Sequence, residues 1–175
     1  MARFLPVFYS DDFLNHDTGA GHPECPDRLN ACVSALKNSD ISDKLVWKSP
    51  RNATEEELNW IHSAEHIENI KQVCESGGGY LDSDTPVCSK SYDIALKSAG
   101  AWLDGLEVVL DKNSALILSR PPGHHAERNR AMGFCLFSNA ALAAVAALKH
   151  DEINKVCIFD WDVHHGNGTQ NIIQN

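Results

Sequence analysis

Residues 155–168 read Lys-Val-Cys-Ile-Phe-Asp-Trp-Asp-Val-His-His-Gly-Asn-Gly, and our prediction of the fold starts from them. Its first part, 155–159, is a short and mostly apolar run, which indicates a buried strand rather than one with a solvated face. The polar and ionisable residues of 160–168 follow at once. They would leave the carboxyl end of the strand, where open α/β sheets bind their ligands.

A second unit of the same kind lies upstream. The apolar run 114–118 predicts a buried strand, 119–132 a polar loop, and 134–148 an Ala-rich helix. Two strand–loop–helix units predict an α/β fold with a parallel sheet flanked by helices. We also expect a strand at 4–9 and loops at 10–26 and 81–86. Helices are expected from Pro26, at 54–61, at 63–74 and at 89–110. The helix at 54–61 would begin with a capping box formed by Thr54 and Glu57.

Composition limits the classes of partner and the setting. The chain has 175 residues and a formal net charge of −9, which argues against nucleic acid, because binding to phosphates relies on clustered Lys and Arg. The longest apolar run, 140–148, is too short to cross a membrane. The six cysteines of the chain include no C-x-x-C pair, and no secretion signal is evident. We therefore expect a reduced protein in the cytoplasm, or in the nucleus if the chain is eukaryotic.

The loop after the strand at 155–159 has the residues of a metal site. Asp160, Asp162 and His164 alternate, so in an extended chain they share one face. A carboxylate and an imidazole on one face can bind zinc, and catalytic zinc commonly takes three protein ligands and a water molecule. The alternative is a polar loop whose histidines merely follow a strand end.

The upstream loop carries a pair of histidines, His124 and His125, directly after Pro121-Pro122-Gly123. An imidazole titrates near neutrality, which suits general acid–base catalysis. A carboxylate or amide on the other ring nitrogen would fix its tautomer. The alternative is a surface loop with two solvated histidines.

Together with residues 21–29 and 82–86, these segments occur in an order that resembles the histone deacetylase family, and its class II branch most closely. The resemblance covers about residues 9–170 and rests on R-P-P-G-H-H-A, M-G-F-C and D-W-D-V-H-H-G-N-G-T-Q. It implies a single α/β domain of the arginase/deacetylase type. Residues 1–175 would be the N-terminal part of that domain, with a sheet that is incomplete at the C-terminus.

The resemblance also assigns the chemistry. Asp162 and His164 would be two of three zinc ligands, and His124 and His125 the catalytic dyad. Asp160 would accept a hydrogen bond from His124, and Asn167 would orient His125. A structural potassium ion is expected near Asp160, Asp162 and His164.

Four residues would contact the substrate or product. Phe134 and Gly133 would line the channel for an acyl-lysine chain, and Asp84 would bind the substrate's backbone at the rim. Arg28 would line the inner cavity used by acetate.

The implied activity is zinc-dependent removal of acetyl groups from an acetylated lysine protein, an acetylpolyamine or a small acetylated metabolite. The family's third zinc ligand and its catalytic Tyr are expected further along the sequence than residue 175, so we predict that residues 1–175 alone are inactive. One alternative is a non-catalytic remnant that binds a partner or an acetylated ligand. Another is an arginase-type enzyme with two manganese ions, which Gly166 disfavours because that family has an Asp at this position.

Overall fold

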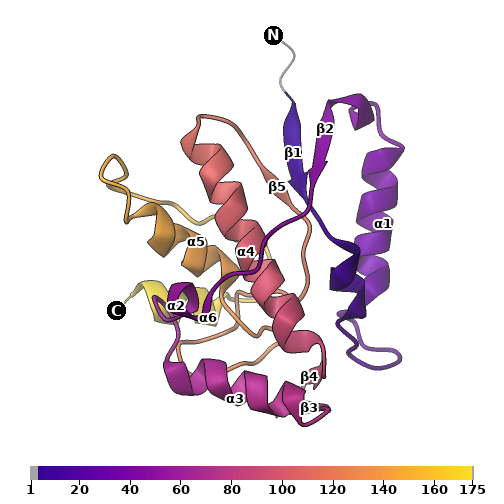
Figure 1. Cartoon of the computed structure of the whole chain (residues 1–175), viewed down its shortest axis with the longest axis vertical. Coiled ribbons are helices and arrows are strands. Elements are labelled where there is room, and N and C mark those ends of the chain that lie inside the picture. The colour runs from indigo at the N-terminus through magenta and orange to yellow at the C-terminus, as the bar shows by residue number, and fades with distance from the viewer. Residues whose placement is uncertain (1–3, 175) are drawn as a thin grey trace.

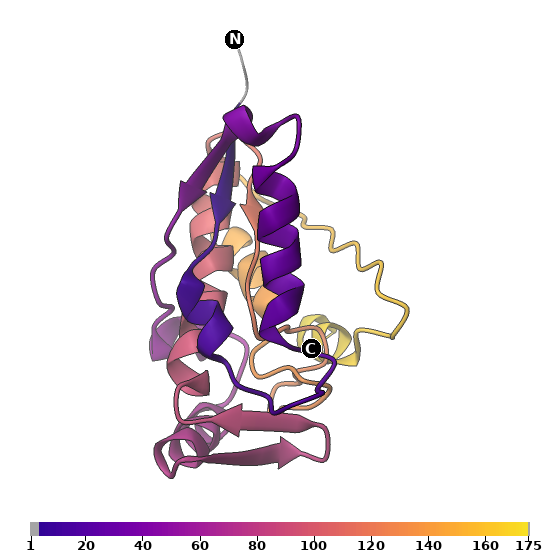
Figure 2. The same ribbon diagram turned by 90° about the vertical axis from the view of Figure 1, so that its right-hand side faces the viewer.

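The computed structural model describes residues 4–174. Its main sheet has three parallel strands in the order β2 (Leu45–Lys48), β1 (Leu5–Phe8) and β5 (Leu116–Ile117). Helix α1 (Pro26–Lys37) lies on one side of this sheet and α4 (Ser91–Leu110) on the other (Figures 1 and 2). The prediction of a parallel α/β fold is therefore confirmed.

The main hydrophobic core lies beyond α4, away from α1. Helix α4 packs there against α3 (Ala64–Glu75) and α5 (Asn139–Ala147). Burying a Leu, Ile or Phe side chain contributes roughly 1.5–3 kcal/mol, so this cluster contributes strongly to the stability of the fold. Its fully buried large side chains are Leu58, Ile61, Ile70, Leu136, Phe137 and Leu142.

A β-hairpin occupies the lower edge of the molecule in Figure 2, where a loop was predicted. Strands β3 (Gly78–Asp82) and β4 (Thr85–Cys88) pair in antiparallel fashion. The glycines at 77–79 indicated only the end of a helix, but Gly78 also permits close pairing. It has φ +106°, and a Cβ there would lie 2.4 Å from the Val87 carbonyl oxygen. The predicted loop at 81–86 is therefore wrong.

The predicted buried strand at 155–159 is also wrong. No backbone hydrogen bond joins residues 154–161 to any other residue within 4–174. Figure 2 shows this segment, between α5 and α6 (Asn167–Ile173), as a trace that stands apart from the sheet. Phe159 is 83% exposed and Trp161 is 88% exposed. The apolar sequence of 155–159 predicted burial, but a strand is buried only where other segments of the protein pack against both of its faces.

The remaining helix predictions agree with the structure to within a few residues, except at α5. The Thr54/Glu57 capping box is present at α2 (Glu55–Leu58). Short 3-10 turns occur at Asp11–Asn15 and Ser42–Lys44. Helix α5 begins at Asn139 rather than at 134 because Met132 and Cys135 pair in a tight turn. No helix within residues 4–174 is both long and apolar enough to span a bilayer.

Candidate catalytic and metal-binding site

The structure brings His124 and His125 together in the loop that follows β5. Their ring centroids are 4.0 Å apart. His124 Nδ1 donates to Asp160 Oδ2 at 2.9 Å, and His125 Nδ1 lies 2.6 Å from Asn167 Oδ1. Each imidazole thus has an oxygen partner on Nδ1, and its Nε2 is the nitrogen left for chemistry.

A buried ion pair holds the start of this loop. Arg120 Nε donates to Glu24 Oε1 at 2.6 Å and its Nη2 to Glu24 Oε2 at 2.8 Å. Both side chains are at most 2% exposed, and Arg120 Nη1 also donates to the Phe13 carbonyl oxygen. Such a two-pronged contact fixes orientation as well as position. Sequence reasoning missed this role, although both residues lie within the motifs that carried the resemblance.

Two further buried histidines hold the other end of the loop. His62 Nδ1 donates to the Glu127 carbonyl oxygen at 3.0 Å, and its Nε2 accepts the Ser138 N–H at 3.0 Å. His66 Nε2 donates to the Leu136 carbonyl oxygen at 2.9 Å. Burial lowers the pKa of His62 to about 3, with the neighbouring His66 adding to the effect. Nothing in the local sequence marked these two residues, since their partners lie about 70 residues away.

Asp162 and His164 form the second half of the site. His164 Nδ1 lies 2.9 Å from Asp162 Oδ1, which also accepts the His164 backbone N–H at 2.8 Å. These hydrogen bonds lower the pKa of Asp162. The ring of His164 is 6.1 Å from that of His125, so this pair lies beside the dyad.

The carboxylate of Asp160 connects the two halves of the site. Its Oδ2 accepts from His124, and its Oδ1 accepts the Asp162 N–H at 3.1 Å. Burial raises the pKa of Asp160, but the hydrogen bonds from His124 and Asp162 outweigh it, so the pKa is lowered overall.

The chemistry of the donors at Asp162 and His164 suits zinc, which binds carboxylate oxygen and imidazole nitrogen. The two donor atoms are already neighbours, and both side chains are accessible, with 47% and 72% exposure. Within residues 4–174, no group of three or more His, Cys, Asp or Glu side chains is arranged to hold a metal ion. Asp162 and His164 thus offer one oxygen and one nitrogen of the kinds that zinc accepts.

Asp84, Gly133 and Phe134 gather at the edge of the dyad. Asp84 Oδ1 accepts the Gly133 N–H at 3.2 Å, and the ring of His22 lies edge-on to Phe134 at 4.6 Å. Gly133 touches the dyad directly, because a Cβ on it would lie 2.4 Å from His125 Cδ2. Sequence reasoning placed His22 in a motif but gave it no role.

Arg28 lies on helix α1 and forms no hydrogen bond with either histidine of the dyad within residues 4–174. It is in the first turn of α1, its side chain is 59% exposed, and Nη1 contacts Glu24 Oε1 at 3.3 Å. Glu24 is also the partner of Arg120, so Arg28 connects to the dyad loop through that buried carboxylate.

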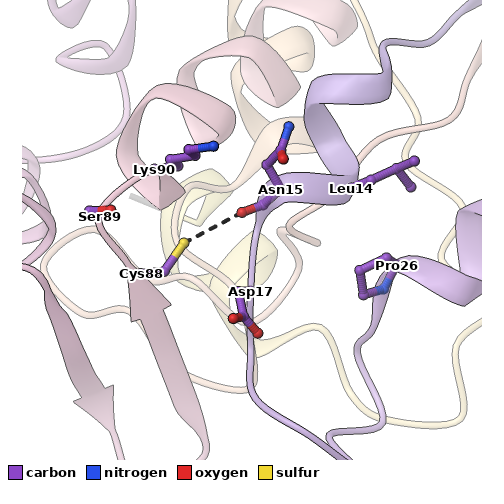
Figure 3. A pocket seen from close by; sticks show the side chains of 7 residues that line it. All are labelled: Leu14, Asn15, Asp17, Pro26, Cys88, Ser89 and Lys90. Atoms are coloured by element: carbon purple, nitrogen blue, oxygen red, sulfur yellow. Dashed lines mark hydrogen bonds between the residues drawn. The ribbon is translucent and has the colours of Figure 1, made fainter.

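A surface pocket of about 410 Å³ lies among other residues (Figure 3). Within it, Cys88 Sγ lies 3.5 Å from the Asn15 carbonyl oxygen. None of the predicted site residues lines this pocket, so it contributes nothing to the site described above. Its lining residues are Leu14, Asn15, Asp17, Pro26, Cys88, Ser89 and Lys90.

Comparison with known proteins identifies the family. The sequence profile of the Histone deacetylase domain matches residues 22–175. An uncharacterized protein of Synechocystis is 46% identical over 98% of this chain and 58% of its own length. A histone deacetylase-like amidohydrolase of Pseudomonas aeruginosa is 43% identical over 98% of this chain and 45% of its own.

A solved structure agrees with the sequence matches. The HDA15 HD domain superposes with a TM-score of 0.91 at 36% identity, and the match covers 98% of this chain and 50% of that one. The chain thus spans about half the length of the proteins it resembles. On the profile, the sequence relatives and the shared fold, this chain belongs to the histone deacetylase family.

Proposed function

We propose that this chain supplies the acid–base groups and two zinc ligands of a zinc-dependent deacetylase site of the histone deacetylase type. The substrates we propose are acetylated lysine in proteins, acetylpolyamines and small acetylated metabolites. The observation that carries the proposal is the convergence of two imidazoles, each with an oxygen partner on Nδ1, beside a neighbouring carboxylate–imidazole pair.

We assign zinc to Asp162 and His164 because their donor atoms are already adjacent and accessible. A bound zinc ion would polarise the amide carbonyl and lower the pKa of a water molecule. The carbonyls of this loop, with the carboxylate of Asp162, are our candidates for the potassium site. Arg28 remains our candidate for contact with acetate.

The protein's own residues move the protons. His125, which donates Nδ1–H to Asn167, can accept a proton from the attacking water at Nε2. The water oxygen forms a bond to the acyl carbon, and the carbon–nitrogen bond breaks. A histidine of the dyad returns a proton to the leaving amine, so that acetate and a free amine result. Asp160 accepts the Nδ1–H of His124 and so holds that ring with its Nε2 directed to the site.

The edge residues orient the substrate in this proposal. Phe134 and Gly133 would contact the aliphatic part of an acyl-lysine chain. Asp84 can accept backbone N–H groups of a peptide, since a carboxylate offers several acceptor sites. Its hydrogen bond to Gly133 holds the carboxylate close to the dyad.

Zinc titration tests the ligand assignment. We expect Asp162→Asn and His164→Gln each to weaken zinc binding by at least about tenfold, because each removes one of few ligands. The exposed neighbour His165 provides the matched control, and His165→Gln should bind zinc as the unaltered chain does. Unchanged zinc affinity in both ligand variants would refute the assignment.

A deacetylation assay tests the activity of residues 1–175. With two protein ligands, we expect no turnover of an acetyl-lysine peptide in the presence of zinc, because a catalytic zinc commonly needs three. Turnover that requires zinc and disappears in Asp162→Asn would contradict this expectation, while still supporting the assignment of Asp162 as a ligand.

A further inference from the structure

The amide of Asn167 lies between His125 and a residue that the proposed function does not use, Glu127. Asn167 Oδ1 is 2.6 Å from His125 Nδ1, and Asn167 Nδ2 donates to Glu127 Oε1 at 2.8 Å. The same Nδ2 lies 3.6 Å from Met132 Sδ. Glu127, Asn167 and His125 thus form one chain of hydrogen bonds that ends on the dyad.

The order of donors along this chain follows from Glu127. A carboxylate only accepts hydrogen bonds, so it draws the NH₂ group of Asn167 toward itself. The amide oxygen must then face His125, and His125 must donate from Nδ1. Asn167 alone cannot impose this arrangement, because its oxygen and nitrogen ends have nearly the same shape and its amide can turn over.

The other histidine of the dyad needs no such support. His124 Nδ1 faces Asp160, whose carboxylate accepts from it in either orientation. His125 faces an amide instead, and this amide has a carboxylate behind it.

Glu127 is itself held firmly. Its backbone N–H donates to the Arg130 carbonyl oxygen at 2.9 Å, and its own carbonyl accepts from buried His62 at 3.0 Å. On the other side, the first turn of α6 is fixed to the dyad, since Gly168 N donates to the His124 carbonyl oxygen at 2.9 Å. Glu127 and Asn167 therefore meet between two anchored segments.

We propose that Glu127 is a positioning residue, which sets the orientation of the Asn167 amide and through it the Nδ1–H tautomer of His125. Its relevance to catalysis rests on the proposed function, in which His125 Nε2 accepts a proton. The tautomer itself can be observed without activity or metal, so a failure of either idea is distinguishable from a failure of the other.

The test is ring ¹⁵N NMR of the histidines in residues 1–175, at a pH about two units above the ordinary histidine value of about 6.5. His125 is assigned by the signals that vanish in His125→Phe. In the unaltered chain we expect Nδ1 protonated and Nε2 not. Glu127→Lys places a donor behind Asn167, so the amide should turn over and the two ring nitrogens of His125 should exchange their protonation states.

A rescue variant separates this effect from damage to the fold. Glu127→Lys combined with Asn167→Asp should restore the Nδ1–H form, because a carboxylate at 167 accepts from both neighbours. Glu152→Lys, the same charge change at an exposed site, should leave His125 unaltered. If Glu127→Lys does not fold, Glu127→Met replaces it and should give a mixture of tautomers. An unchanged His125 tautomer in whichever of these Glu127 variants folds, or no restoration by Asn167→Asp, overturns the proposal.

Discussion

Three buried histidines, His16, His62 and His66, make the fold sensitive to acid. Burial lowers the pKa of His16 to about 4 and that of His62 to about 3, and it lowers the pKa of His66 as well. The folded chain keeps these rings neutral, whereas the unfolded chain protonates them near pH 6.5. Their contribution to stability is therefore complete above pH 6.5 and is lost as the pH falls toward 4.

We expect His62→Gln to flatten this dependence. Each such histidine contributes a slope of about 1.4 kcal/mol per pH unit between its unfolded and folded pKa values. Urea unfolding between about pH 6.5 and 4 should thus show a smaller loss of stability in His62→Gln than in the unaltered chain. The exposed His150 supplies the control, and His150→Gln should keep the original slope. Equal slopes in all three proteins would contradict the prediction.

Gly168 permits the close contact between α6 and the dyad. A Cβ there would lie 2.3 Å from the Ala126 carbonyl oxygen and 2.5 Å from the His125 carbonyl carbon. We expect Gly168→Ala to lower the free energy of unfolding by roughly 1–3 kcal/mol, because backbone atoms must move apart. In Gly79→Ala the nearest atom is Val73 Cγ1 at 3.4 Å, so urea denaturation of this control should show a smaller loss.

At the scale of elements, local signals were predictable and pairings were not. The capping box at Thr54 and the N-cap at Ser63 depend on residues within one turn, so the sequence contains all of their information. The β3–β4 hairpin was missed because its turn lacks the usual two-residue signature, and its glycines also end α3. The His62–Glu127 contact joins residues 65 apart, which no local pattern reports.

The capping box offers a test at this scale. Thr54 Oγ1 accepts the Glu57 N–H at 3.1 Å, and the Glu57 carboxylate accepts the Thr54 N–H and also pairs with Arg51. We expect Thr54→Ala to cost about 1 kcal/mol in urea unfolding, whereas Thr54→Ser should stay close to the unaltered chain. An alanine variant as stable as the serine one would show that the cap contributes little.

For the whole molecule, the fold class followed from sequence but the environment of one segment did not. The short apolar runs of β1 and β5 predicted strands in a parallel sheet, whereas β2, which pairs with β1, was not predicted. The same reasoning predicted that residues 155–159 are buried, but in the structure this segment is largely exposed. The candidate residues at 160–168 do not depend on that error, because their alternation and spacing are independent of what covers residues 155–159.

Exposed apolar side chains on this segment predict self-association. Phe159 and Trp161 are more than 80% exposed on a stretch whose backbone groups are unpaired within residues 4–174. Extended, apolar and unpaired chain promotes association between copies. We expect Phe159→Ser with Trp161→Ser to shift sedimentation velocity profiles toward the monomer. Val109→Ser, on exposed Val109 of α4, should not have this effect.

Residues 154–161 form no backbone hydrogen bonds with the rest of 4–174, and this has a thermodynamic consequence for Asp162 and His164, which follow directly. Any cation that binds both side chains ties down the end of this stretch and reduces the number of conformations open to it. Part of the intrinsic binding energy is then spent on ordering chain, so the apparent affinity for the ion understates the strength of its coordination bonds. Amide hydrogen exchange at 154–161 should accordingly slow when zinc is added.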